Sequence, residues 1–216
     1  MGRIVICISG LSGAGKTGVT RKLKVKINAE EFSLGAICRA ICFYMELNKI
    51  TVYDKAIVNT IMKDPLAWRI IEGITCDPKI QNEKYARGAS KLFQIPEVSR
   101  WCTEFLRMQP YSIGTKPIIF EGRGSGWLFP LAPVNVWLDA DEMVRFMRKY
   151  KDAIKLDANT NFSDLVKSLS MRDGFEARNA IMPAKYMPGA VRIDTTHMTE
   201  DNVVAEIAKI YNRKIK

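Results

Sequence analysis

One loop near the N-terminus constrains the fold of this chain more than any other segment. Residues 10–17 read Gly-Leu-Ser-Gly-Ala-Gly-Lys-Thr and fit the pattern Gly-x-x-x-x-Gly-Lys-Ser/Thr. An apolar run at residues 4–8 precedes the loop, and Val19, Leu23 and Ile27 follow it at helical spacing. A buried strand, a glycine-rich turn and a helix in this order predict the first βα unit of an α/β fold.

The residue types of this loop suit a bound phosphate. Its glycines let backbone N–H groups point inward, and the following helix directs the positive end of its dipole to the same place. Lys16 can then reach the β- and γ-phosphates of a nucleotide, and the hydroxyl of Thr17 can bind Mg²⁺. The sequence thus predicts an ATP or GTP site made by Gly10, Ser12, Gly13, Ala14, Gly15, Lys16, Thr17 and Gly18.

The rest of the chain continues the same alternation of strands and helices. Apolar runs predict four buried strands, at residues 4–8, 118–120, 134–138 and 191–193. A helical stripe over residues 199–211 closes the pattern, whereas residues 48–87 carry only weak periodicity and are treated as an insertion. We therefore expect a three-layer α/β/α fold with a central parallel sheet, in a single domain over residues 1–216.

Composition narrows the classes of function. No run approaches the roughly 18 apolar residues that cross a bilayer, and no signal peptide is recognisable, so a cytoplasmic protein without membrane contact is expected. The five cysteines contain no Cys-x-x-Cys pair and cannot form a zinc site with the single histidine. The formal net charge of +10 suits a polyanionic ligand, but aromatic and basic residues are not interleaved as in single-strand binding motifs. Specific nucleic-acid binding is therefore not expected.

Charged residues at the strand ends favour a small kinase. A GTPase would carry Asn-Lys-x-Asp after a later strand, and this chain has none. Phosphoryl transfer is catalysed mostly by positioning and by preorganised cations. Glu121 and Arg123 follow one predicted strand, and Arg145 and Arg148 follow the next at helical spacing. We predict that Lys16, Arg123, Arg145 and Arg148 are catalytic and that Thr17 and Glu121 bind Mg²⁺.

These segments together resemble the cytidylate (CMP) kinases of the nucleoside monophosphate kinase superfamily, in order from residue 4 to about residue 207. Beyond the phosphate loop, the resemblance rests on residues 33–40, 89–98, 121–126, 138–149, 172–173 and 193–196. It implies ATP as phosphoryl donor, Mg²⁺ as cofactor and a nucleoside monophosphate, CMP or dCMP, as acceptor. It also implies a monophosphate-binding insertion at about 31–115 and a lid at 149–175. We expect a monomer that acts on small nucleotides.

The resemblance further implies the acceptor site, at Leu34, Arg39, Ser90, Arg123, Arg172, Glu176 and Arg178. Arg39 matches an arginine that grips the acceptor phosphate, and Ser90 matches a serine that contacts the base. The chain departs from bacterial members at Ser33, Cys38, Ser99 and Gly124, which stand where those members carry Asp, Tyr, often Arg, and Asp. Each replaced group contacts the acceptor, so the donor side fits the family better than the acceptor side.

Two further interpretations remain open. P-loop kinases share a donor site across many acceptors, so another nucleotide or a phosphorylated metabolite is a possible acceptor. A degenerate protein that binds ATP without turnover is the other alternative, and it is motivated by Gly124, Cys38 and Ser99. The presence of Lys16 and Thr17 argues against this second alternative.

Overall fold

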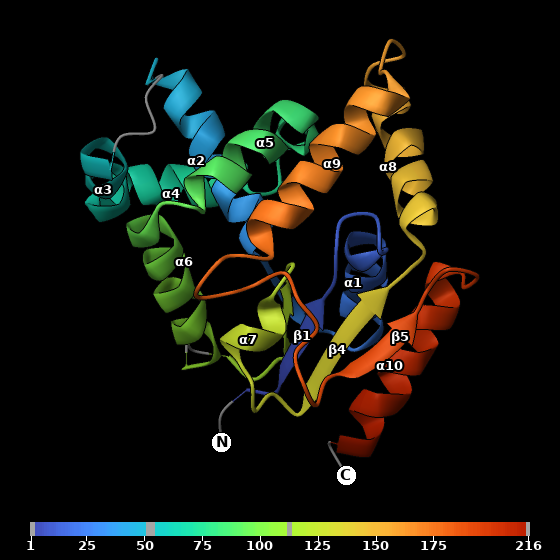
Figure 1. The fold of residues 1–216 in the computed structure, drawn as a ribbon. Coiled ribbons are helices and arrows are strands. Elements are labelled where there is room, and N and C mark those ends of the chain that lie inside the picture. Colours follow the sequence, from blue (N-terminus) through green and yellow to red (C-terminus); the bar gives the residue numbers. More distant parts are fainter. Residues whose placement is uncertain (1–2, 51–54, 112–113, 215–216) are drawn as a thin grey trace. The chain divides into compact units, whose positions relative to one another are not determined.

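A computed structural model describes residues 3–50, 55–111 and 114–214 of the chain (Figure 1). The chain divides into two compact units. One consists of Met1–Phe32 and Arg107–Lys216, and we call it the sheet unit; the other is Ser33–Leu106, and we call it the helical unit.

The central sheet has five strands: β1 (Val5–Ser9), β2 (Glu30–Ser33), β3 (Ile118–Glu121), β4 (Val134–Asp139) and β5 (Val191–Asp194). Their order is β2-β3-β1-β4-β5, and β1 pairs in parallel with β3 and β4, as β4 does with β5. The four predicted strands are all present, but the prediction that 191–193 is buried is wrong, because β5 lies at the edge of the sheet and is largely exposed. The sequence pattern did not predict β2, because this short edge strand is half-buried and contains no apolar run.

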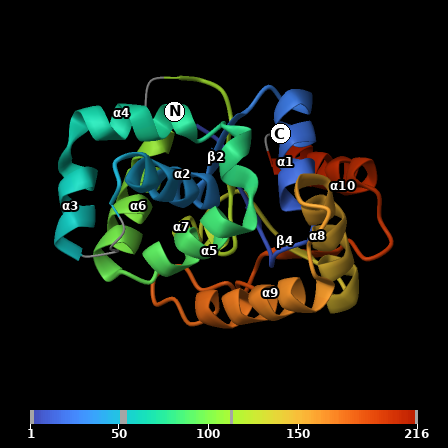
Figure 2. The same cartoon turned by 90° about the horizontal axis from the view of Figure 1, so that it is seen from above.

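Two helices cover one face of this sheet. In Figures 1 and 2, α1 (Lys16–Lys26) and α10 (Glu200–Lys214) lie side by side. Val19 and Leu23 of α1 are buried with Ile207 of α10 against the strand residues Ile6 and Val136. The short helix α7 (Ser125–Leu128) lies against β1 and β4. The α/β fold class with a central parallel sheet is therefore confirmed.

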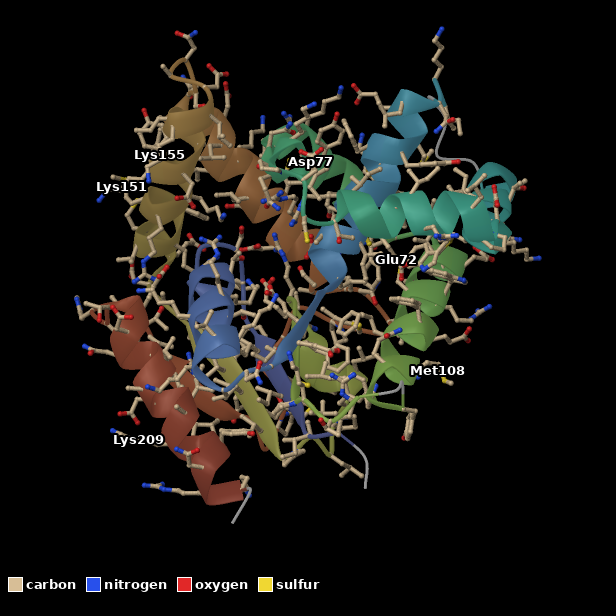
Figure 3. All side chains as sticks on the ribbon, turned by 180° about the vertical axis from the view of Figure 1, so that it is seen from behind. Glu72, Asp77, Met108, Lys151, Lys155 and Lys209 are labelled. Carbon is tan, nitrogen blue, oxygen red and sulfur yellow. The ribbon has the colours of Figure 1, made fainter. Side chains whose placement is uncertain are left out.

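Helices α8 (Glu142–Leu156) and α9 (Phe162–Glu176) form a hairpin with a small core of its own (Figure 2). Phe146 of α8 packs against Leu165 and Leu169 of α9. On the solvent side of α8, Lys151 and Lys155 project outward (Figure 3). The hairpin thus has an apolar core of its own, and two lysines of α8 face solvent.

The helical unit is built from α2 (Leu34–Leu47), α3 (Lys55–Lys63), α4 (Pro65–Ile74), the 3₁₀ turn η1 (Pro78–Gln81), α5 (Glu83–Leu92) and most of α6 (Pro96–Met108). The 3₁₀ turn η2 (Gln109–Tyr111) follows α6. Helix α2 packs against α4 and α5. The rings of Trp68 on α4 and Trp101 on α6 are in contact, with their centroids 4.3 Å apart. Much of residues 48–87, which the sequence pattern left without elements, is therefore helical. Asp64 and Asn82 cap α4 and α5 there.

None of the helices within residues 3–50, 55–111 and 114–214 is long and apolar enough to cross a membrane.

Candidate active site

The phosphate loop joins β1 to α1 through backbone conformations that favour glycine. Gly10, Gly13 and Gly15 have φ angles of 148°, 79° and 93°. A Cβ added at Gly13 would lie 2.3 Å from the carbonyl oxygen of Arg145, so the backbone of α8 passes directly against the loop. Glycine at position 13 is therefore required both by the turn and by this close approach.

Lys16 begins α1 and is held inside the loop. Its ammonium donates a hydrogen bond to the carbonyl oxygen of Leu11 at 2.9 Å, and its side chain is buried. Burial lowers the pKa of Lys16 to about 8; Glu121 raises it by a smaller amount, and Arg123 lowers it further. A cation in this position can exchange a neutral carbonyl for a phosphate oxygen, which is a stronger partner.

Thr17 and Glu121 place two oxygen ligands together beside the loop. The Thr17 hydroxyl donates to Oε1 of Glu121 at 3.4 Å, and Glu121 is buried at the end of β3. Hydroxyl and carboxylate oxygens suit Mg²⁺, which typically binds one or two protein groups and takes its other ligands from phosphates and water. The part of the chain that the structure describes has no group of three or more His, Cys, Asp or Glu side chains that could hold a metal. A cation here would therefore need a nucleotide to complete its coordination.

Arg148 ties α8 to the segment that follows β5. Its guanidinium donates to the carbonyl oxygen of Thr195 at 2.6 Å and to the Thr195 hydroxyl at 3.0 Å. That hydroxyl also lies 3.2 Å from the carbonyl oxygen of Ala14 in the phosphate loop. Three segments distant in sequence thus meet beside the phosphate loop.

Arg123 and Arg145 share one carboxylate. Arg123 contacts Oδ1 of Asp173, and its Nε lies 2.6 Å from Oε2 of Glu176. Arg145, which is 4% exposed, donates from Nη1 to Oδ2 of Asp173 and to the carbonyl oxygen of Ser12, both at 2.9 Å. The two acidic residues of α9 therefore hold Arg123, which follows β3, and Arg145, which lies on α8.

The sheet unit contains most of the predicted site residues, and it brings together Lys16, Thr17, Glu121, Arg123, Arg145, Arg148 and Glu176. Arg172 lies buried on α9. Arg178 is exposed in the turn after α9, and its guanidinium lies over the ring of Phe175 at 5.4 Å.

The other predicted acceptor residues lie in the helical unit. Leu34 begins α2, and Arg39 on the same helix donates to Oε1 of Gln81 at 3.4 Å. Ser90 lies on α5, which packs against α2.

Two residues of the site were not predicted as such. Asp173 lies three positions before Glu176, so the two share a face of α9, and this spacing is a signal that the sequence does contain. Thr195 follows β5 directly, but its contact with Ala14 spans 181 positions and nothing local indicates it.

Gly124, where the chain departs from the family pattern, is closely packed. A Cβ at this position would lie 2.6 Å from the carbonyl oxygen of Pro183 and 2.9 Å from that of Met182. We expect Gly124→Ala to lower the free energy of unfolding by about 1–3 kcal/mol, because the backbone after α9 would have to shift. Urea unfolding monitored by circular dichroism measures this change.

Gly174→Ala is the matched control for this substitution. Gly174 lies within α9, and an added Cβ there meets nothing within 4 Å among the described residues. Alanine favours a helix interior over glycine by about 1 kcal/mol, so this variant is expected to be more stable than the wild type. A Gly124→Ala protein as stable as the wild type would contradict the packing described above.

Comparisons with known proteins agree with this geometry. The family model described as Cytidylate kinase matches residues 6–213. A cytidylate kinase from Mesomycoplasma hyopneumoniae (strain 232) is 27% identical over 222 residues, which cover 99% of this chain and 95% of the relative. A cytidylate kinase from Lactiplantibacillus plantarum is 28% identical over 221 residues, with 97% and 95% covered.

Among solved structures, an uncharacterized protein from Eubacterium ventriosum ATCC 27560 matches with a TM-score of 0.55 at 13% identity. The match covers 97% of this chain and 99% of that one, and it supports the fold alone. The family match extends over nearly the whole chain, including the phosphate loop and the arginine-bearing segments. The chain therefore belongs to the cytidylate kinase family, and it is a nucleoside monophosphate kinase.

Proposed function

We propose that the enzyme transfers the γ-phosphoryl group of ATP to CMP or dCMP and forms ADP and CDP or dCDP. The observation that carries this proposal is the convergence of Arg145 and Arg148 on the phosphate loop that holds Lys16, with Arg123 close enough to lower the pKa of Lys16. The chain also matches the cytidylate kinase family from residue 6 to residue 213. In the reaction, an oxygen of the acceptor phosphate attacks the γ-phosphorus as the bond to the β–γ bridging oxygen breaks.

The donor side of this mechanism rests on cations that are already in place. Lys16 is shielded from solvent and would exchange the Leu11 carbonyl for phosphate oxygens. Arg145 and Arg148 both donate to backbone oxygens of the phosphate loop, at Ser12 and Gly13, so they need little rearrangement to stabilise the transferring group. Thr17 and Glu121 would hold Mg²⁺, which would neutralise charge that develops on the phosphate oxygens.

We assign the acceptor phosphate to Arg39 and Arg123 and the remainder of the acceptor to Leu34, Ser90, Arg172, Glu176 and Arg178. The assignment follows the family pattern at these positions. We further propose that residues 1–216 act as one kinase domain in which the region at 31–115 binds the monophosphate. In this proposal residues 149–175, which include most of the α8–α9 hairpin, close as a lid and exclude water from the reacting phosphates.

A second candidate is a kinase of the same chemistry with a different small acceptor. Three of the positions that depart from the family pattern serve local structure instead. Ser33 caps α2 by accepting a hydrogen bond from the Ala36 amide at 3.3 Å, and Ser99 donates to the carbonyl oxygen of Pro96 at 3.1 Å. Gly124 packs against a backbone carbonyl oxygen. Side chains that the family uses on the acceptor are thus replaced here, which favours a changed base or sugar preference.

A panel of acceptors tests the proposed function. ADP release from ATP and Mg²⁺ is measured with CMP, dCMP, UMP, AMP, GMP and dTMP, each against a control without acceptor. We expect the highest kcat/KM with CMP or dCMP, by about tenfold or more over the other bases, because a site built to hydrogen-bond one base discriminates strongly against the others. Preference for another monophosphate would support the second candidate. Inertness of every monophosphate would contradict the proposal.

A further inference from the structure

One carboxylate in the sheet unit bridges two arginines that the proposed reaction needs. Oδ1 of Asp173, near the end of α9, contacts Arg123, and Oδ2 accepts a hydrogen bond from Nη1 of Arg145 at 2.9 Å. The three side chains are 14%, 16% and 4% exposed, respectively. The bridge is therefore largely shielded from water, where ionic contacts are stronger than on the surface.

Each arginine is also held at a second point. Nη1 of Arg145 donates to the carbonyl oxygen of Ser12 in the phosphate loop, and Nε of Arg123 pairs with Glu176. Asp173 and Glu176 lie about one turn apart on the same face of α9, so one helix supplies both carboxylates. The two guanidinium charges and the two carboxylate charges cancel.

We propose that Asp173 is a positioning residue that takes the place of a phosphate group at Arg145, that the donor nucleotide displaces it from Arg145, and that it continues to hold Arg123. The inference rests on the proposed function, because that function assigns Arg145 to the donor and Arg123 to the acceptor phosphate. A guanidinium pairs in the same planar geometry with a carboxylate and with a phosphate, so the two anions compete for it.

This arrangement has opposite effects on binding and on turnover. Displacing Asp173 breaks charge-assisted contacts, which weakens the binding of every phosphate ligand. In return, Asp173 keeps Arg123 ordered after the nucleotide has taken its place at Arg145. Removal of the negative charge should therefore tighten nucleotide binding and slow the reaction, whereas loss of a merely structural contact would impair both.

Asp173→Asn tests this inference because it preserves the shape of the side chain and removes its charge. We expect the Kd of a non-hydrolysable ATP analogue with Mg²⁺, measured by calorimetry without acceptor, to fall about tenfold. We expect kcat with the preferred monophosphate to fall about tenfold or more, because an uncharged amide holds Arg123 less firmly while the nucleotide occupies Arg145. Asp201→Asn, an exposed change of equal charge at the start of α10, should leave both values unchanged.

Asp173→Glu supplies a second variant that restores the negative charge. Its Kd for the analogue should stay near the wild-type value, while its longer side chain displaces the arginines and lowers kcat. If Asp173→Asn does not fold, this variant decides the question, because about tenfold weaker analogue binding by Asp173→Glu would overturn the inference.

The outcomes separate this inference from the proposed function. Tighter binding with slower turnover in Asp173→Asn supports the inference. If the wild-type protein binds the analogue and Asp173→Asn binds it equally well or more weakly, the inference is overturned and the proposed function is not. Failure of the wild-type protein to bind the analogue would overturn the proposed function, and this inference with it.

Discussion

Replacing Lys16 with methionine is expected to lower kcat by about 10³-fold or more, because it removes a preorganised cation from the transferring phosphoryl group. Methionine keeps most of the length of the side chain and carries no charge. The donor–acceptor pair that performs best in the acceptor panel is the assay for this loss. Lys26→Met, at the exposed last turn of α1, is a matched control and should retain full turnover.

The same substitution is expected to raise the free energy of unfolding at pH 7. Burial lowers the pKa of Lys16 in the folded protein to about 8, from an ordinary value of 10.5. A lowered pKa means that the protonated form is disfavoured in the folded state. The free energy of unfolding of the wild type is therefore lowest below about pH 8 and rises as the pH increases from about 8 to 10.5. Methionine removes this cost but also removes the hydrogen bond to Leu11. We therefore expect a net increase in the free energy of unfolding on the order of 1–2 kcal/mol.

Urea unfolding of both proteins between pH 7 and pH 10 measures this difference. The stability advantage of Lys16→Met should shrink as the pH rises through this interval, because the wild-type ammonium loses its proton. A variant that is both active and less stable than the wild type would contradict the buried, functional position of Lys16.

Arg145→Lys is expected to lower kcat by about 10²-fold while the protein remains folded. Arg145 is 4% exposed, and its planar guanidinium bonds at once to the Ser12 carbonyl oxygen and to Asp173. An ammonium keeps the positive charge but cannot reproduce this fork of donors, so the charge that faces the phosphate loop is no longer oriented. Steady-state kinetics with ATP and the preferred monophosphate give the change in kcat and in KM separately.

Arg145→Ala separates catalysis from structure at the same position. It leaves the Ser12 carbonyl and one oxygen of Asp173 without this partner. We therefore expect its free energy of unfolding to be about 2–4 kcal/mol lower than that of the wild type. Arg192→Ala is the control, because Arg192 is an exposed arginine that pairs with Asp139 at the edge of the sheet. Its stability and turnover should remain near wild-type values. Turnover by Arg145→Lys equal to that of the wild type would exclude a catalytic role for the guanidinium.

The phosphate loop was predictable because its residues are contiguous. The phosphate loop is one stretch of eight residues between a strand and a helix, and its chemistry depends on local backbone geometry. Strands β1, β3 and β4 were predictable for a related reason: each lies in the interior of the sheet and is buried and mostly apolar. The edge strand β2 lacks this signal, as Glu30 and Glu31 show.

The amino-acid sequence by itself therefore determined the α/β class, the phosphate loop and the identity of the cations, since these depend on residue type and short-range spacing. Tertiary structure alone decided which partners those cations have. Arg123 meets Asp173 across 50 positions, Arg145 meets Ser12 across 133, and Thr195 meets Ala14 across 181. Such contacts form only when the sheet brings the ends of β1, β3, β4 and β5 to one edge, and no local pattern encodes which side chains then lie within a hydrogen bond of one another.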